Sequence, residues 1–216
     1  MYTLFVQKKQ REPSPFPLTA QLHQFILDTD ANGIFVCPGH LSRGATKIQQ
    51  FLDSFLDGTN IKKVGIGNKF GFNSITTYER YLTGRNMLWN VRRNGKSDHR
   101  KMVFILKIKD PNDIPALDKN NYQTMLTAPG NKHLIEVLGV AIGSSNFSHP
   151  TYGILTSGVM SADKGEADIL MFFDETFKNR FVQQVSDAFV LSESITPVGY
   201  KFFMEMFMET LKYTLA

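Results

Sequence analysis

A histidine and a lysine separated by one residue precede a strongly apolar segment in the middle of the chain. His99 and Lys101 stand in the run DHRKMVFILK, and residues 102–108 read as a β-strand because apolar and β-branched residues dominate them. Side chains two positions apart at a strand point to the same face. The spacing therefore predicts an imidazole, which can act as a nucleophile, beside a fixed ammonium group.

A second polar segment follows another apolar run. The sequence GSSN, residues 143–146, comes directly after the segment 134–142, which also reads as a strand. Glycine permits a tight exit from the strand, and the amide of Asn146 is a hydrogen-bond donor. If the two strands pair as an antiparallel hairpin, we expect His99, Lys101 and Asn146 to converge at one edge of the sheet.

These two motifs in this order resemble the signature of the phospholipase D superfamily, H-x-K followed by G-S-x-N. The likeness extends to an acidic residue, Glu166, placed before another apolar segment that leads into a predicted helix. The run GIFVCPGHLSRGATKIQQFL is similar to the first strand and helix of that family. The resemblance implies phosphodiester cleavage that needs no metal ion and no cofactor.

The resemblance also implies a role for each residue. His99 would attack phosphorus and form a phosphohistidine, while Lys101 and Asn146 would bind the nonbridging oxygens. Ser144 could add a hydroxyl donor. Glu166 would hydrogen-bond the far nitrogen of the imidazole and so fix its tautomer and orientation.

A second histidine is needed to protonate the leaving oxygen and then activate water. The chain has five histidines but a single H-x-K, so the resemblance to one-motif members implies that the partner is His99 of a second subunit across a two-fold axis. We therefore expect a homodimer, with His40, His133 and His149 as alternative sources of the acid. The interface is expected at the strand edge beside the site or on an apolar stripe of the C-terminal helix, Phe202, Phe203, Met206 and Phe207.

The chain departs from the family pattern in two places. The family usually has an aspartate shortly after the lysine, whereas Leu106 and Lys107 stand there in this chain. The interval between Lys101 and Asn146 is also longer than usual. These departures favour the nuclease-like, restriction-type branch of the family, and they leave an inactive relative as an alternative.

Positive charge is concentrated beside the H-x-K motif. The chain carries 24 Lys and Arg against 20 Asp and Glu, with a formal charge of +4, and residues 85–101 hold six basic residues against one acid. Such a run favours the backbone of a nucleic acid, DNA rather than RNA. The residues expected to bind it are Arg85, Arg92, Arg93, Lys96 and Arg100.

Two other functions remain open from the sequence. One is a phospholipase D-type hydrolase of lipids, and the other is a noncatalytic nucleic-acid-binding subunit, possible in a restriction or defence complex with further subunits. Three aromatic residues near the basic run, Tyr78, Tyr81 and Trp89, could stack on bases, although packing in the core is the more common use of such residues.

The elements that must position these residues alternate between helix and strand. They predict a single domain over residues 1–216, of the α/β class, with a mixed sheet flanked by helices on both faces as a phospholipase D-like layered sandwich. Strands are expected at 34–37, 62–71, 102–108, 134–143 and 167–173, and helices at 18–30, 45–58, 76–91, 174–191 and 197–215. Thr19 and Ser42 are expected to cap the first two helices, Gly58 to end the second, and residues 109–132 to form an irregular insertion.

Composition limits the class of protein. Hydrophobic residues make up 42% of the chain, which is enough for a sizeable core. Cys37 is the single cysteine, so an intramolecular disulfide is excluded and a reducing cytoplasm is expected. No run of 18 or more apolar residues predicts a membrane span, and the first residues lack the pattern of a signal peptide.

Overall fold

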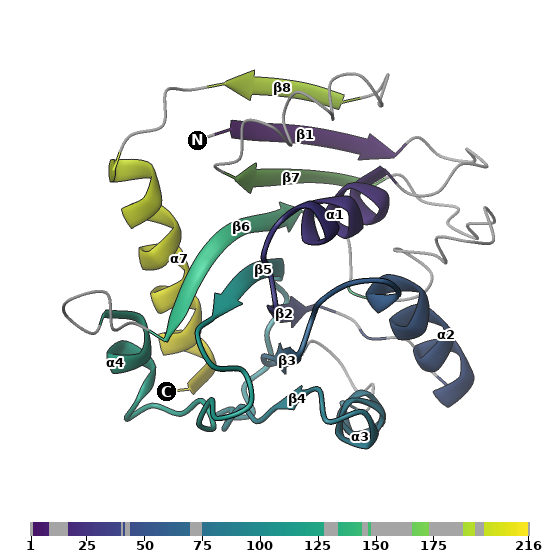
Figure 1. Ribbon diagram of the computed structural model, residues 1–216, viewed down its shortest axis with the longest axis vertical. Coiled ribbons are helices and arrows are strands. Elements are labelled where there is room, and N and C mark those ends of the chain that lie inside the picture. Colours follow the sequence, from purple (N-terminus) through teal and green to yellow (C-terminus); the bar gives the residue numbers. More distant parts are fainter. Residues whose placement is uncertain are drawn as a thin grey trace.

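Figure 1 shows the chain as a computed structural model, in which one large sheet is flanked by helices. The structure describes the backbone of residues 2–8, 17–39, 41, 44–69, 75–127, 134–143, 147, 166–172, 188–192 and 197–215, and the side chains of most of them. The strands are β1 (Tyr2–Lys8), β2 (Gly33–Pro38), β3 (Lys63–Ile66), β4 (Leu88–Trp89), β5 (Lys101–Ile108), β6 (Ile135–Gly143), β7 (Glu166–Phe172) and β8 (Ala188–Ser192). The helices are α1 (Pro17–Asp28), α2 (Ala45–Leu56), α3 (Thr76–Gly84), α4 (Tyr122–Thr127) and α7 (Pro197–Leu215).

The eight strands form a single mixed sheet in the order β4-β3-β2-β5-β6-β7-β1-β8. β2, β3 and β4 run parallel to one another, and every other neighbouring pair is antiparallel. The α1 and α2 helices connect strands in the manner of an α/β fold. The predicted α/β class with a mixed sheet is therefore confirmed.

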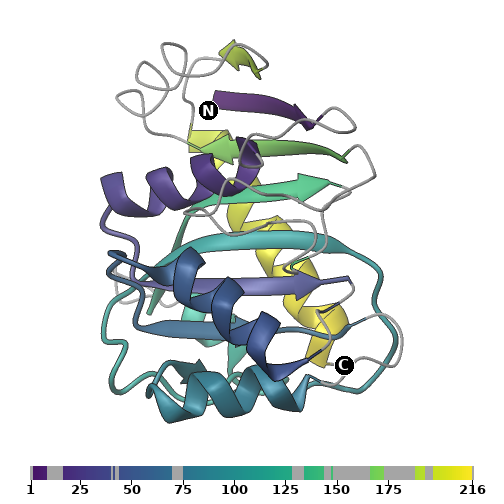
Figure 2. The same cartoon turned by 90° about the vertical axis from the view of Figure 1, so that its right-hand side faces the viewer.

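Helices cover both faces of this sheet, as predicted, and Figure 2 shows α1, α2 and α3 on one side with α7 on the other. Strand alternation divides the core accordingly. In β2, Ile34 and Val36 face α1, α2 and α3, whereas Phe35 and Cys37 face α4 and α7. Every residue of β2 is buried, which fits the prediction of a central strand.

Three strand ends and one strand start meet at one edge of the sheet, here called the site edge. β5 runs antiparallel to β2, so Lys101 at the start of β5 lies opposite Pro38 at the end of β2. β6 pairs with β5 as the predicted antiparallel hairpin, with Met102 opposite Ile142. β3 is parallel to β2 and ends at this edge too. The pairing therefore brings segments that are far apart in sequence to one place.

The three predicted helix caps have different outcomes. α1 begins at Pro17, so Thr19 lies inside the helix and does not cap it. α2 begins after Gly44, which makes no side-chain cap, and Ser42, which was expected to cap this helix, lies outside the described residues. Gly58 follows α2 with φ +68°, a left-handed conformation that glycine adopts without strain, and this prediction is confirmed.

The helix predicted at 76–91 is too long. α3 ends at Gly84, the chain turns at Arg85 and Asn86, and Leu88–Trp89 forms the edge strand β4. Asn86 has φ +56°, which helical periodicity could not reveal. The buried Trp89 packs edge-to-face on Phe35, so tertiary packing overrides the local helical pattern.

Three further segments correct the sequence-based assignment. The insertion at 109–132 contains a short helix, α4, which packs against α7 and β6. Residues 188–191 belong to a strand, β8, and not to the end of the predicted helix 174–191, whose earlier part lies outside the described residues. The first residues form β1 between β7 and β8. A short apolar run fits either a helix or a strand, and only pairing partners decide between them.

Candidate active site

His99 and Lys101 meet at the site edge, as their spacing predicts. Lys101 is the first residue of β5, and His99 lies two residues before it in an exposed position. The Nζ atom of Lys101 is 3.3 Å from Nε2 of His99 and 3.3 Å from the carbonyl oxygen of the same residue. The ammonium group of Lys101 therefore contacts both the imidazole ring and the backbone of His99.

The chemistry of an ammonium group constrains the tautomer of His99. Lysine can only donate hydrogen bonds, so a bond from Nζ requires an unprotonated Nε2 that accepts it. A neutral imidazole in this state carries its proton on Nδ1. The lone pair of Nε2 is then engaged by Lys101, and it becomes available for nucleophilic attack when the ammonium group turns away.

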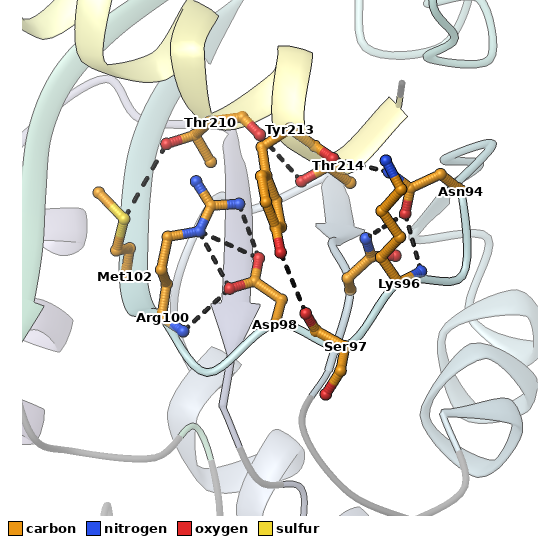
Figure 3. Close-up of polar contacts among 10 residues, drawn as sticks. Asn94, Lys96, Ser97, Asp98, Arg100, Met102, Thr210, Tyr213 and Thr214 are labelled. Atoms are coloured by element: carbon orange, nitrogen blue, oxygen red, sulfur yellow. Dashed lines mark hydrogen bonds and ion pairs between the residues drawn. The ribbon is translucent and has the colours of Figure 1, made fainter.

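Asp98 and Arg100, which alternate with His99 and Lys101 along the chain, form an ion pair whose carboxylate is buried (Figure 3). Asp98 has 3% of its surface exposed and accepts hydrogen bonds from the backbone N–H of Arg100 at 2.9 Å and from two nitrogens of its guanidinium at 2.7 to 3.1 Å. The guanidinium also lies 4.5 Å from the centre of the Tyr213 ring in α7. This interaction fixes the backbone on both sides of His99.

The last turn of α7 anchors the segment that leads to His99. The Tyr213 hydroxyl donates to the carbonyl of Ser97 at 3.2 Å. The Asn94 side chain donates to the Tyr213 carbonyl at 2.8 Å, and the Asn94 backbone N–H donates to the carbonyl of Thr214 at 2.9 Å. These contacts, drawn in Figure 3, join residues more than one hundred positions apart. An open pocket of about 440 Å³ lies beside them, lined by Asp98, His99, Arg100 and Tyr213.

Asn146 and Ser144 lie outside the described residues, so their predicted place beside His99 stays a prediction. The described residues on either side of them are both at the site edge. Gly143 ends β6 one position beyond the Met102–Ile142 pair. Phe147 is buried and donates its backbone N–H to the carbonyl of Pro38, which lies opposite Lys101.

Glu166 is the first residue of β7, and its side chain lies outside the described residues. Two positions later, Asp168 is 2% exposed and lies opposite Gly143 in the register of β6 and β7. Sequence reasoning did not select Asp168. An acid within an apolar strand does indicate a candidate functional residue, because burial of a carboxylate is costly unless the charge is compensated.

Two of the five residues predicted to bind nucleic acid also hold the fold together. Arg93 donates to Glu79 at 2.6 Å and to the carbonyl of Ile66 at 2.9 Å. Arg100 is paired with Asp98 as described above. Their side chains are about one fifth and one third exposed, respectively. Both contribute positive charge near the site edge, but replacing either one also removes structural contacts.

The other three predicted residues are more exposed. Arg85 lies 2.5 Å from Asp53 and stacks over the ring of Tyr81 at 4.6 Å. Arg92 is 73% exposed, and Lys96 is exposed in the loop before His99. Of the three aromatic residues considered for base stacking, Tyr78 and Trp89 are buried in the core and Tyr81 donates a hydrogen bond to Asp53. Packing is thus their principal use.

Cys37 does not provide an alternative nucleophile. The thiol is buried beneath the site edge, and burial raises its pKa to about 12, while Arg100 opposes the shift and Asp98 adds to it. A thiol with a raised pKa stays protonated at neutral pH and is a poor nucleophile. Of the apolar stripe expected on the C-terminal helix, Phe207 is fully buried against Phe35 and Phe104 and is not available for an interface between subunits, Met206 is half-buried, and the side chains of Phe202 and Phe203 lie outside the described residues.

Comparisons with known proteins give no family for this chain: no family model matches it, and no curated protein is significantly similar to it. In the described part of the chain, no group of three or more His, Cys, Asp or Glu residues is arranged to hold a metal ion. None of the described helices is both long enough and apolar enough to cross a bilayer.

Proposed function

We propose that this protein is a phosphodiesterase that cleaves a nucleic-acid strand, with His99 as the nucleophile. The contact between Lys101 Nζ and His99 Nε2 carries this proposal, because it joins a lone pair to a cation in an exposed position at a sheet edge. When a phosphodiester enters, the ammonium would turn to a nonbridging oxygen and release Nε2 for attack.

The reaction would proceed by two displacements. In the first, Nε2 of His99 forms a bond to phosphorus, and the bond from phosphorus to the leaving oxygen breaks as that oxygen receives a proton. In the second, water attacks phosphorus, the phosphorus–nitrogen bond breaks, and the water proton passes to the base. Lys101 and Asn146 would bind the nonbridging oxygens in both steps, Ser144 would add a donor, and Glu166 would orient Nδ1.

The acid and base of these steps must be a group other than the attacking imidazole. We propose that it is the partner subunit's His99, in a homodimer whose two half-sites meet across a two-fold axis to form one complete site. The exposed position of His99 at the end of the sheet supports this arrangement, since a second copy can approach it there. Because Phe207 is buried within the subunit, the edge beside the site is the favoured surface for joining the two subunits.

The proposed function is tested by incubating the purified protein in excess chelator with plasmid, single-stranded DNA, RNA and phospholipid vesicles. We expect the nucleic acid, DNA in particular, to be cleaved with the chelator present, because the charge stabilisation comes from Lys101 and its neighbours. Trapping with denaturant during turnover should leave one end of the cleaved strand joined to His99 through its phosphate. Release of lipid head groups alone would favour the lipid hydrolase, and cleavage that requires added divalent ions would contradict the proposal.

Mixing of subunits tests the shared site. Wild-type chains and chains carrying His99→Ala are unfolded together, refolded in varied ratios and assayed at constant total protein. If each site needs two His99 residues, heterodimers are inactive and the activity falls as the square of the wild-type fraction. The same titration with His23→Ala chains, whose histidine lies in α1, should show no loss. A linear fall with His99→Ala would show that one subunit is sufficient and would return His40, His133 and His149 as sources of the acid.

A further inference from the structure

A hollow of about 410 Å³ lies at the site edge, next to the segment that carries His99. It is formed by the end of β3, the start of α3 and the loop before β5. The described residues of its lining include three basic residues and no acidic one: Asn68, Lys69, Ile75, Arg93, Gly95, Lys96 and Ser97. A volume in this range suits a small polar ligand or one unit of a polymer.

A network of side-chain amides holds the shape of this hollow. Asn94 accepts hydrogen bonds from the backbone N–H of Lys96 at 2.9 Å and from the side chain of the buried Asn68 at 2.7 Å. Gly95 between them has φ +78°, which lets the loop turn tightly. Lys96 and Lys69, which follows the end of β3 by three residues, therefore line the same hollow.

Two further features favour an anion in the hollow. Ile75 stands at the N-cap of α3 and gives no side-chain cap, and the positive end of the helix dipole at this terminus favours negative charge. Arg93 is paired with Glu79, and Lys69 and Lys96 are the two other basic residues of the described lining. The backbone N–H of Asp98 donates to the carbonyl of Lys69 at 3.1 Å, so the hollow is joined directly to the residue before His99.

We propose that Lys69 and Lys96 form a subsite that binds the phosphate adjacent to the one His99 attacks in a nucleic-acid strand. This inference rests on the proposed function for the position of the attacked phosphate. Each nucleotide brings one phosphate, so a strand bound at His99 must place the neighbouring phosphate within a short distance of it. The hollow places cations next to the segment that carries His99, where this neighbouring phosphate would lie. Lys69 was not among the residues that the sequence predicted to bind nucleic acid.

The test measures binding of a fluorescent single-stranded DNA of about twelve nucleotides to full-length protein carrying His99→Ala, which prevents cleavage during the measurement. Lys69→Ala and Lys96→Ala together should weaken binding by about tenfold or more at low salt. The slope of log affinity against log salt should become shallower by about 0.7 for each phosphate that the variant no longer binds. Lys62→Ala with Lys109→Ala is the matched control, because both lysines are exposed at the opposite end of the sheet and the net charge changes equally.

Arginine at positions 69 and 96 should restore most of the affinity and the salt slope, since it keeps the charge. A thermal melt of each variant separates weaker binding from a failure to fold, and Lys96→Ala alone, at an exposed position, should show part of the effect. Equal affinity and slope in the alanine pair and the control pair would overturn the subsite, as would a wild-type chain that binds no DNA at low salt. If the wild type cleaves DNA while the alanine pair binds normally, the proposed function stands and the subsite fails. If the alanine pair loses binding but the wild type does not cleave DNA, the subsite is supported and the proposed nuclease function is overturned.

Discussion

Replacement of His99 with alanine removes phosphodiester cleavage, with an expected fall in kcat of about four or more orders of magnitude. The imidazole is the group that bonds to phosphorus. No neighbouring side chain in the described pocket can replace it, since Asp98 and Arg100 form an ion pair with each other. His99 is exposed, so the free energy of unfolding should change by no more than about 0.5 kcal/mol. Single-turnover cleavage of a labelled DNA together with a thermal melt gives both quantities.

His23→Ala is the control for this variant. His23 lies in α1 and its Nε2 is 2.8 Å from the carbonyl of Asp57, so its loss removes a surface hydrogen bond and leaves the site edge untouched. We expect wild-type cleavage from this variant. A His99→Ala protein that melts normally and cleaves at the wild-type rate would remove the central claim and show that another residue is the nucleophile.

Lys101→Ala has the second-largest expected effect, a loss of about two or more orders of magnitude in kcat. The ammonium contacts both the ring and the carbonyl of His99, so its removal takes away charge stabilisation and also the contact that holds the imidazole. We expect Asn146→Ala to cause a loss of similar size. Substrate affinity should fall less than kcat, because the cation is needed most as charge develops in the transition state.

Lys107→Ala is the matched control for Lys101→Ala because both lysines belong to β5. Lys107 is exposed near the far end of the strand and is paired with Asp30, and exposed pairs of this kind contribute little to stability. It should therefore retain wild-type kcat. Equal activities of the two variants would show that Lys101 acts as an ordinary surface residue and that the contact with His99 has no chemical role.

Strong local patterns in the sequence were sufficient for the main elements. The helix predicted at 197–215 matches α7, and the strand predicted at 34–37 lies within β2, because a long or wholly apolar segment has few alternatives. The hairpin of β5 and β6 was also predicted, and this pairing places Gly143 near Lys101. Prediction failed at 76–91 and 188–191, where the choice between helix and strand depends on a neighbouring strand that the local sequence does not reveal.

The sequence by itself determined the types and spacing of the groups that can do chemistry. An H-x-K at the start of an apolar strand places the histidine and the lysine side by side, whatever surrounds them, because strand geometry fixes the direction of alternate side chains. It also determined that positive charge would gather in the segment before His99, since the residues are contiguous.

Only the tertiary structure decided which of those charges are available to a ligand. Arg93 and Arg100 look equivalent to Lys96 in the sequence, yet the first two have acidic partners from α3 and from the loop before β5, whereas Lys96 lines a hollow with Lys69. Lys69 comes from the end of β3, far before Lys101 in the sequence. The reason is physical: a hydrogen bond or ion pair depends on distance in space, and parallel strand pairing together with the docking of α7 sets those distances across the chain.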